Sequence, residues 1–443
     1  MTTSDRYALR FVLLGVCALW LGALFGLIGS WQHVIPGIIE WVPFVKSRPL
    51  HVSLVIGWIF MAAVGGIYYY LPRITGTTLF APRWVRLHLV VWIVTGLAII
   101  GSYLMGRFGG REYWEFPPVL GAVIAAAWLL LVVNFFRTAF KRKGPWPAYL
   151  WMWTTGIVFF LFTFLEAYGW LWLGGEENVI RDITVQWKAY GALTGSWNML
   201  VYGTAMVVME RISGDRAPAL SRTAFLIFAL GFTNLLFGWA HHIYPVPSAL
   251  WLRILAYAIS MTEWILLARM IRQWRGTLDA AQRHAHLSAW RFLYASEVWV
   301  FLNLGLALLI SIPAINLFAH GTFIIVAHAM GSTIGINTMI LFASVFHLVG
   351  TTRHAGRART AFHLVNGSLV VFWLGLIGAG MVKGWYTVMS DLSFQAIMEL
   401  VRPFLVVFAV AGIGLFTGLT LLATQAVRNL WNPIASSTNT PMP

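Results

Sequence analysis

Residues 321–348 read GTFIIVAHAMGSTIGINTMILFASVFHL and contain no Asp, Glu, Lys or Arg. A helix that crosses the hydrocarbon core of a bilayer needs roughly 20 predominantly apolar residues, so this stretch is long enough to span a membrane. Similar apolar runs lie near residues 10–31, 50–71, 86–105, 118–140, 149–173, 185–209, 222–243, 249–270, 289–313, 364–388 and 400–425. The sequence therefore predicts an all-α integral membrane protein with about twelve transmembrane helices.

The composition agrees with this fold class. Of the 443 residues, 59% are hydrophobic and 10% are charged, whereas a soluble protein carries about 25% charged residues. No segment is long or polar enough to form a soluble domain, so we expect one membrane domain over residues 1–443. We interpret the run from Phe11 to Ile28 as a retained helix and not as a signal peptide. The single cysteine, Cys17, excludes a disulfide framework, a thiolate zinc site and a C-x-x-C-H covalent heme motif.

The charge distribution predicts the orientation of the chain. The net charge is +15, and most of the 30 Lys and Arg residues lie at the N-terminus, at the C-terminus and in the short loops that follow the even-numbered spans. Cytoplasmic loops of membrane proteins carry such an excess, so both termini should be cytoplasmic. Because the basic residues follow the membrane topology, they do not indicate a nucleic-acid partner.

Histidines collect at one predicted depth of the membrane. His51 opens the second span, His241 and His242 close the seventh, and His320 and His328 lie at the outer end of the tenth. A single histidine at such a depth is usually a hydrogen-bonded core residue. Several together favour a heme or metal cluster, because ionisable groups in a membrane are costly without partners.

The tenth span places two side chains that can bind iron close together. His328 and Met330 are two residues apart, which on a helix is about 200°, so they point to opposite sides. One helix could then serve two hemes, with His51 as the opposite ligand of the heme that Met330 faces. The alternative for Met330 is simple packing, since methionine often fills gaps in apolar cores.

Five sequence motifs, taken together, resemble the heme–copper oxidase superfamily. Within it, the chain is most similar to the catalytic subunit of cytochrome-c-dependent nitric oxide reductase, over nearly its whole length. The motifs are Arg48-Pro-Leu-His51 followed by Tyr-Tyr-Tyr-Leu-Pro72, Gly110-Arg-Glu-Tyr-Trp-Glu115, Gly238-Trp-Ala-His-His242, Ser260-Met-Thr-Glu263, and His320-Gly-Thr with Ala327-His328.

The resemblance implies two heme b groups and a non-heme metal. His51 is similar to an axial ligand of the low-spin heme, and His328 to the proximal ligand of the high-spin heme. His241 and His242 resemble ligands of non-heme iron or copper facing that heme. Met330 stands where the family has the second low-spin histidine.

Further residues resemble groups that surround the hemes. Glu112 matches a carboxylate that binds calcium between heme propionates, and Arg111 is its propionate-facing neighbour. His320 is placed like a residue near the propionates. Glu263 matches a buried acid, either a proton donor or a group that supports the metal.

The sixth span departs from the family pattern. The family supplies a histidine and two glutamates there, and alignment on Gly195-Ser-Trp197 puts Tyr190, Thr194 and Asn198 at those places. They lie at i, i+4 and i+8, so they share one helix face and should still line the pocket. A site with two imidazoles and no carboxylate has lost the ligand that suits iron. It should hold copper, bind iron weakly with Tyr190 or water, or stay without metal.

The leading function is therefore nitric oxide reduction to N2O in a bacterial inner membrane, as part of denitrification. The alternatives are nitric oxide dismutation, or a non-catalytic heme subunit that transfers electrons or binds gas; O2 reduction and transport are less favoured. The resemblance implies a membrane-anchored cytochrome c subunit docked on the outer loops, around residues 40–48 and 106–118. It also places the hemes toward the periplasm.

Overall fold

The computed structural model describes residues 2–172, 178–244, 246–276, 279–349 and 355–436. Within these ranges the chain is helical, and its only β-type pairing is an isolated bridge between Arg111 and Trp114. The elements are α1 (Thr3–Gln32), α2 (Phe44–Thr75), α3 (Pro82–Leu104), α4 (Pro118–Ala139), α5 (Ala148–Trp172), α6 (Val179–Ser213), α7 (Ala217–Leu220), α8 (Arg222–Phe237), η1 (Gly238–Ile243), α9 (Leu250–Gly276), α10 (Ala280–Ala285), α11 (Leu287–Ser311), α12 (Pro313–Ala319), α13 (Phe323–Met330), η2 (Gly331–Thr338), α14 (Met339–Leu348), α15 (Ala355–Met389) and α16 (Phe394–Ser436). The prediction of an all-α fold is confirmed.

The long helices follow the predicted spans. In the described part of the chain, 10 helical segments are long and apolar enough to cross a membrane. The remaining two predicted spans, 185–209 and 249–270, lie within α6 and α9. Helix ends coincide with residues that favour them: proline opens α3 and α4, and glycines with left-handed backbone, Gly76 and Gly214, follow α2 and α6.

Two of the predicted spans are not continuous α-helices. The span at 222–243 ends in a 3-10 helix, η1, which carries His241 and His242. The span at 321–348 consists of α13, the π-helix η2 and α14 in succession. Hydrophobic periodicity does not distinguish these variants from an α-helix, so the sequence did not predict them.

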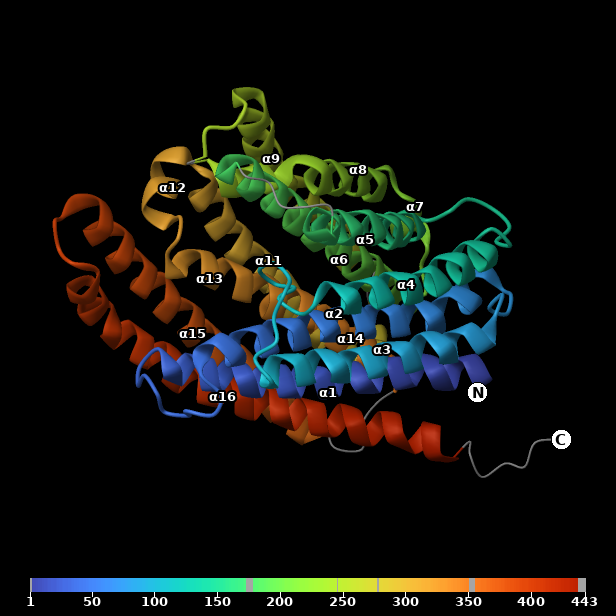
Figure 1. The fold of residues 1–443 in the computed structure, drawn as a ribbon. Helices are drawn as coiled ribbons and strands as arrows, with labels where there is room; N and C mark the ends of the chain where they lie inside the picture. The colour runs from blue at the N-terminus through green and yellow to red at the C-terminus, as the bar shows by residue number, and fades with distance from the viewer. Residues whose placement is uncertain (1, 173–177, 245, 277–278, 350–354, 437–443) are drawn as a thin grey trace.

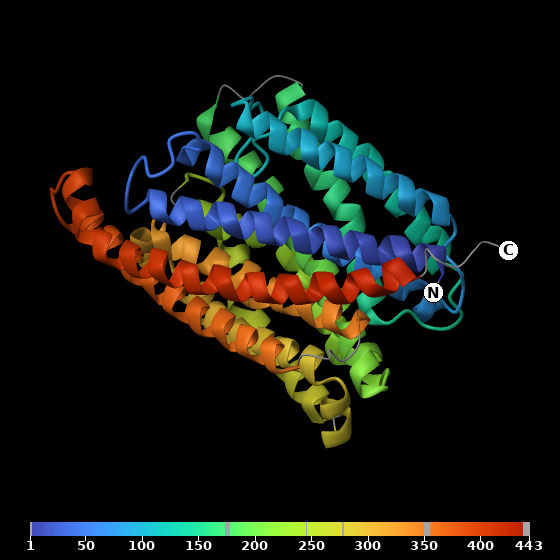
Figure 2. The same ribbon diagram turned by 90° about the horizontal axis from the view of Figure 1, so that it is seen from below.

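The N-terminal and C-terminal helices form one side of the bundle. α1 packs along α2 and α16, and α15 packs on α16 (Figures 1 and 2). A Cβ added at Gly65 would lie 2.8 Å from the carbonyl oxygen of Ala8, so only glycine allows α1 and α2 to approach so closely. The start of α1 and the end of α16 lie at the same end of the bundle in both views. The charge pattern predicts both termini on the same side of the membrane, which requires an even number of crossings. The arrangement of the two ends agrees with this prediction.

α6 packs against helices from both the N-terminal and the C-terminal parts of the chain. It contacts α2, α5, α8, η1 and α14. The predicted pocket residues of the sixth span therefore lie on a helix that contacts both η1 and the tenth span.

Candidate functional site

Three of the predicted histidines come together where η1 meets α13. The rings of His241 and His242 have centroids 4.1 Å apart with an interplanar angle of 41°. Both imidazoles lie near enough to His328 to interact with it electrostatically, and His242 also interacts with His320. Two segments far apart in the sequence thus bring several imidazoles close together.

α6 holds the histidine pair in position. The indole of Trp187 stacks on the ring of His242, with centroids 4.7 Å apart and an interplanar angle of 6°. One turn further along, any side chain larger than hydrogen at Gly191 would overlap the side chain of Trp239 in η1. Aromatic stacking and close backbone packing therefore fix η1 against this helix.

The three residues that replace the family's ligands all lie on α6. Tyr190 is buried, its ring centroid is 5.0 Å from that of Tyr113, and its hydroxyl has no hydrogen-bond partner among the described residues. Thr194 follows one turn later and is half-buried. Asn198 accepts a hydrogen bond of 3.2 Å from the side-chain amide of Asn337 in η2. The helix face thus extends from the outer loop to the tenth span.

The described residues do not assemble a metal site of three or more ligands. No group of three His, Cys, Asp or Glu side chains in that part of the chain could hold a metal ion. Glu263 lies on α9, but its side chain is outside the described residues. That His241 and His242 bind a metal stays a prediction.

His51 lies apart from these histidines, between α1 and α2. Its Nδ1 is 2.7 Å from the carbonyl oxygen of Gly22. Because a carbonyl can only accept, Nδ1 carries the proton and donates it, which leaves Nε2 free to bind a metal. A Cβ added at Gly26 would lie 2.7 Å from the same Nδ1, so this glycine provides the space for the ring. The geometry fits an axial ligand of a heme.

His328 and Met330 end α13, directly before the π-helix. The Nδ1 of His328 is buried and has no hydrogen-bond partner among the described residues, while Met330 is half-buried against the main apolar core. Gly331 and Gly335 begin and continue η2, where added Cβ atoms would collide with Asn303 and Trp299 of α11. π-helical turns are frequent at functional sites. The sequence feature found at this π-helix is the pair Gly331 and Gly335. Hydropathy alone does not reveal the π-helix.

The loop between α3 and α4 contains an ion-pair network that the sequence did not predict. Arg48 donates to both Glu112 and Glu115, the latter at 2.8 Å, and Arg111 pairs with Asp182 at 2.7 Å. Burial raises the pKa of Glu115, and Arg48 opposes that rise. The sequence feature that could have indicated this network is the Arg48-Pro-Leu-His51 motif, to which Arg48 belongs. The calcium site at Glu112 stays a prediction, because its carboxylate here pairs with Arg48.

Two further histidines lie near the N-terminal end of α13. His320 is exposed and follows α12, with its backbone N–H donating to the carbonyl of Asn316 at 2.8 Å. His33, which the predicted histidine cluster did not include, lies beside Phe323 at the start of α13, with ring centroids 5.9 Å apart.

Comparisons with known proteins agree with this architecture. The model of the family "Cytochrome C and Quinol oxidase polypeptide I" matches residues 6–414. The chain is 22% identical to a nitric oxide reductase subunit of Stutzerimonas stutzeri, covering 82% of this chain and 81% of that protein. It is 24% identical to the Cbb3-type cytochrome c oxidase subunit CcoN1 of the same organism, covering 96% and 94%. The solved structure of a heme–copper terminal oxidase dimer matches with a TM-score of 0.76 and 14% identity, covering 98% of this chain and 85% of that one. The chain therefore belongs to the Cytochrome C and Quinol oxidase polypeptide I family, the heme–copper oxidases.

Proposed function

We propose that this chain is the heme-binding subunit of a membrane oxidoreductase that acts on nitric oxide. The observation that carries the proposal is the grouping of His241 and His242 with His328 beside α6, in a family that binds hemes. Imidazole is the usual axial ligand of heme iron, and His328 on α13 would hold the high-spin heme b. The similarity to the nitric oxide reductase of Stutzerimonas stutzeri supports the choice of nitric oxide.

The low-spin heme b would bind between His51 and Met330. The hydrogen bond from Nδ1 of His51 to Gly22 fixes the ring and leaves Nε2 for iron, an arrangement typical of metal-binding histidines. A heme bound there would supply one-electron transfer. Replacing an imidazole ligand by a thioether raises the reduction potential of a heme, so this one would be a weak reductant.

The non-heme site would be copper-bound or metal-free in most molecules. The imidazoles of His241 and His242 are borderline ligands that suit copper, and the described residues add no third His, Cys, Asp or Glu. Weakly bound iron, completed by water or by Tyr190, is the alternative.

The reaction would be the joining of two NO molecules with two electrons and two protons, giving N2O and water. The hydroxyl of the buried Tyr190 has no partner among the described residues and can donate a hydrogen bond to a group in the pocket. The hydrogen bond between Asn198 and Asn337 joins α6 to η2. Because a second metal normally brings the two nitrogens together and neutralises charge, turnover with two imidazoles should be slow.

A second candidate is a heme subunit that binds NO or O2 and transfers electrons without turnover. The absence of a third metal ligand among the described residues favours it. Nitric oxide dismutation at the high-spin heme is a further alternative, and it is catalytic. The similarity to CcoN1 makes O2 the other gas to test.

Electrons would come from a membrane-anchored cytochrome c subunit on the outer loops, residues 40–48 and 106–118. These loops carry the pairs of Arg48 with Glu112 and Glu115. The location would be the bacterial inner membrane, with both termini cytoplasmic and the hemes toward the periplasm.

Addition of NO to the reduced, purified protein tests the proposal. NO should change the absorption and paramagnetic resonance spectra of the high-spin heme, and His328→Ala should abolish the change. N2O measured by gas chromatography, with reduced cytochrome c as donor, should form slowly. Unchanged NO binding in the His328→Ala protein would contradict the proposal.

A further inference from the structure

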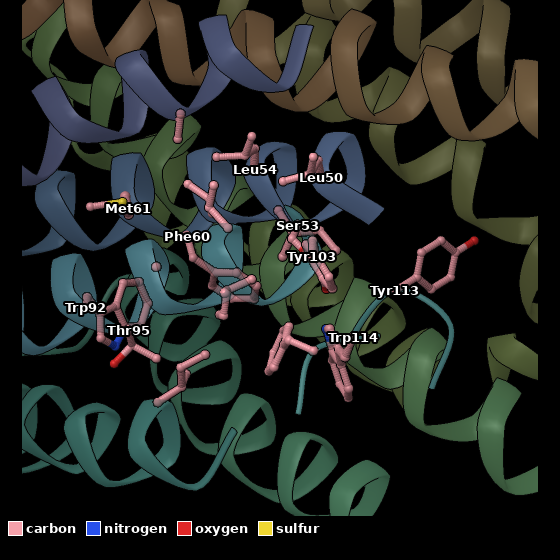
Figure 3. Close-up of a pocket in the computed structure, with 18 of the residues that line it drawn as sticks. Leu50, Ser53, Leu54, Phe60, Met61, Trp92, Thr95, Tyr103, Tyr113 and Trp114 are labelled. Carbon is pink, nitrogen blue, oxygen red and sulfur yellow. The ribbon is translucent and has the colours of Figure 1, made fainter. Parts of the chain in front are cut away.

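An apolar cavity of about 170 Å³ lies on the side of α2 that faces α3. Its lining combines residues of α2, such as Leu54 and Met61, with residues of α3, such as Trp92 and Tyr103 (Figure 3). Most of its wall is apolar. The hydroxyls of Ser53 and Tyr103, which lie in the wall, form a hydrogen bond with each other at 2.9 Å. A cavity of this character suits a hydrocarbon and not a polar ligand.

Two glycines form the open part of the cavity. A Cβ added at Gly57 of α2 or at Gly96 of α3 would meet no atom within 4 Å. Both residues are half-buried, and Val94 and Leu97 on the neighbouring face of α3 are 61% and 65% exposed. The cavity therefore opens at the surface of the bundle that faces the lipid.

The part of α3 that lines the cavity is about as long as one leaflet of a bilayer is thick. Trp92 and Tyr103, both on α3, are 11 residues apart, which on a helix is about 16 Å. The hydrocarbon core is about 30 Å thick, so half of it is about 15 Å. An acyl chain of one leaflet could lie along this wall with only part of its length inside the cavity, because a volume of about 170 Å³ holds a segment of a chain and not a whole one.

Positive charge lies directly above the outer end of the cavity. The ring of Phe108 stacks on Tyr103 with centroids 5.6 Å apart, which places the loop carrying the exposed Arg107 over that end. Lys46 reaches the same place, where its Nζ donates to the carbonyl of Leu104 at 2.9 Å. The neighbouring carboxylates, Glu112 and Glu115, both pair with Arg48. These three groups together carry one negative charge, so Lys46 and Arg107 leave this place with a net positive charge.

We propose that this cavity is a binding site for an anionic phospholipid of the outer leaflet. One acyl chain lies between α2 and α3 along Gly57 and Gly96, and the phosphate binds Lys46 and Arg107. The bound chain covers the side of α2 next to His51. The proposal does not depend on the redox function.

Filling the cavity tests the site. Gly57→Leu and Gly96→Leu place side chains in open space, so both proteins should fold. Gly101→Leu is the matched control, because Gly101 also lies on α3 with no atom within 4 Å of an added Cβ, but does not line the cavity. Native mass spectrometry of the delipidated proteins, titrated with phosphatidylglycerol, measures binding. We expect at least a tenfold loss of affinity in the two cavity variants, and wild-type affinity in the control.

The charge of the head group is tested separately. Lys46→Gln with Arg107→Gln should reduce the preference for phosphatidylglycerol over phosphatidylcholine several-fold. Heme content and melting temperature report the folding of each variant. Equal phosphatidylglycerol binding by the Gly57→Leu and Gly101→Leu proteins would overturn the proposal. Co-purification of an isoprenoid quinone in place of phospholipid, lost only in the cavity variants, would also overturn it.

Discussion

His51 of α2 donates a hydrogen bond from Nδ1 to the carbonyl oxygen of Gly22 in α1, 2.7 Å away. The bond sets the tautomer of the imidazole and leaves Nε2 as its free ligand atom. Gly26 leaves the space for the ring, and Gly22 lets the backbone of α1 lie close to Leu54 and Val55 of α2. The proposed low-spin heme site therefore depends on small residues of α1 as well as on the histidine.

Gly26→Ala should damage this site without removing the ligand. The new methyl group would lie 2.7 Å from Nδ1 of His51, so the ring must move. We expect about 1–3 kcal/mol of destabilisation from overpacking and loss of most of the low-spin heme. Absorption spectra and thermal melting measure both. Gly101→Ala, where the methyl group meets nothing within 4 Å, should behave like the wild type. Equal low-spin heme in both variants would show that His51 is not held in this way.

The two hemes should be separable by mutation. His328→Ala should remove the high-spin signal and leave the low-spin signal largely intact, because His328 is the proposed proximal ligand of the high-spin heme. His51→Ala should do the reverse. Pyridine hemochrome assays and resonance Raman spectra report the two populations. Retention of both hemes in both variants would reject the assignment.

Met330 should be the second ligand of the low-spin heme. The native spectrum should show a charge-transfer band from thioether to iron, and Met330→Leu should abolish it. Met330→His should lower the reduction potential, because imidazole replaces a thioether. Near-infrared magnetic circular dichroism and a redox titration measure these effects. A bis-imidazole spectrum that survives Met330→Leu would point to another histidine, with His320 the first to test.

Arg48 should control the pH dependence of stability through Glu115. Burial raises the pKa of Glu115, so the folded state holds this proton more tightly than the unfolded state, where the pKa is about 4.3. The contribution of Glu115 to stability is therefore complete below about pH 4.3, and it is lost as the pH rises through the pKa that Glu115 has in the folded state. Arg48→Gln removes the opposing charge, so the loss should become larger, by about 1–3 kcal/mol at neutral pH.

Thermal melting between pH 4 and 8 checks this prediction. Arg86→Gln, which changes an exposed arginine on α3, is the control. A uniform loss of stability at all pH values in the Arg48→Gln protein would indicate a packing defect and not the predicted linkage.

The sequence predicted the membrane helices because their signal is local. A run such as 321–348 shows its length and lack of charge directly, and the depth of His241 and His328 follows from counting along each span. The partners of Arg48 could not be predicted, because Glu112 and Glu115 are distant in sequence and their pairing depends on the folded loop. The π-helix after Met330 also escaped prediction, since it depends on contacts of Gly331 and Gly335 with α11.

The iron and copper content per chain, measured with N2O formation on the same heme-replete sample, tests the central claim most directly. Two imidazoles without a carboxylate favour a soft, low-coordinate ion over iron, so we predict about two irons per chain, both in heme, with little N2O. Copper, when present, should be lost from the His241→Ala and His242→Ala proteins. About three irons per chain with rapid N2O formation would contradict the account, because the pocket would then hold a complete non-heme iron site.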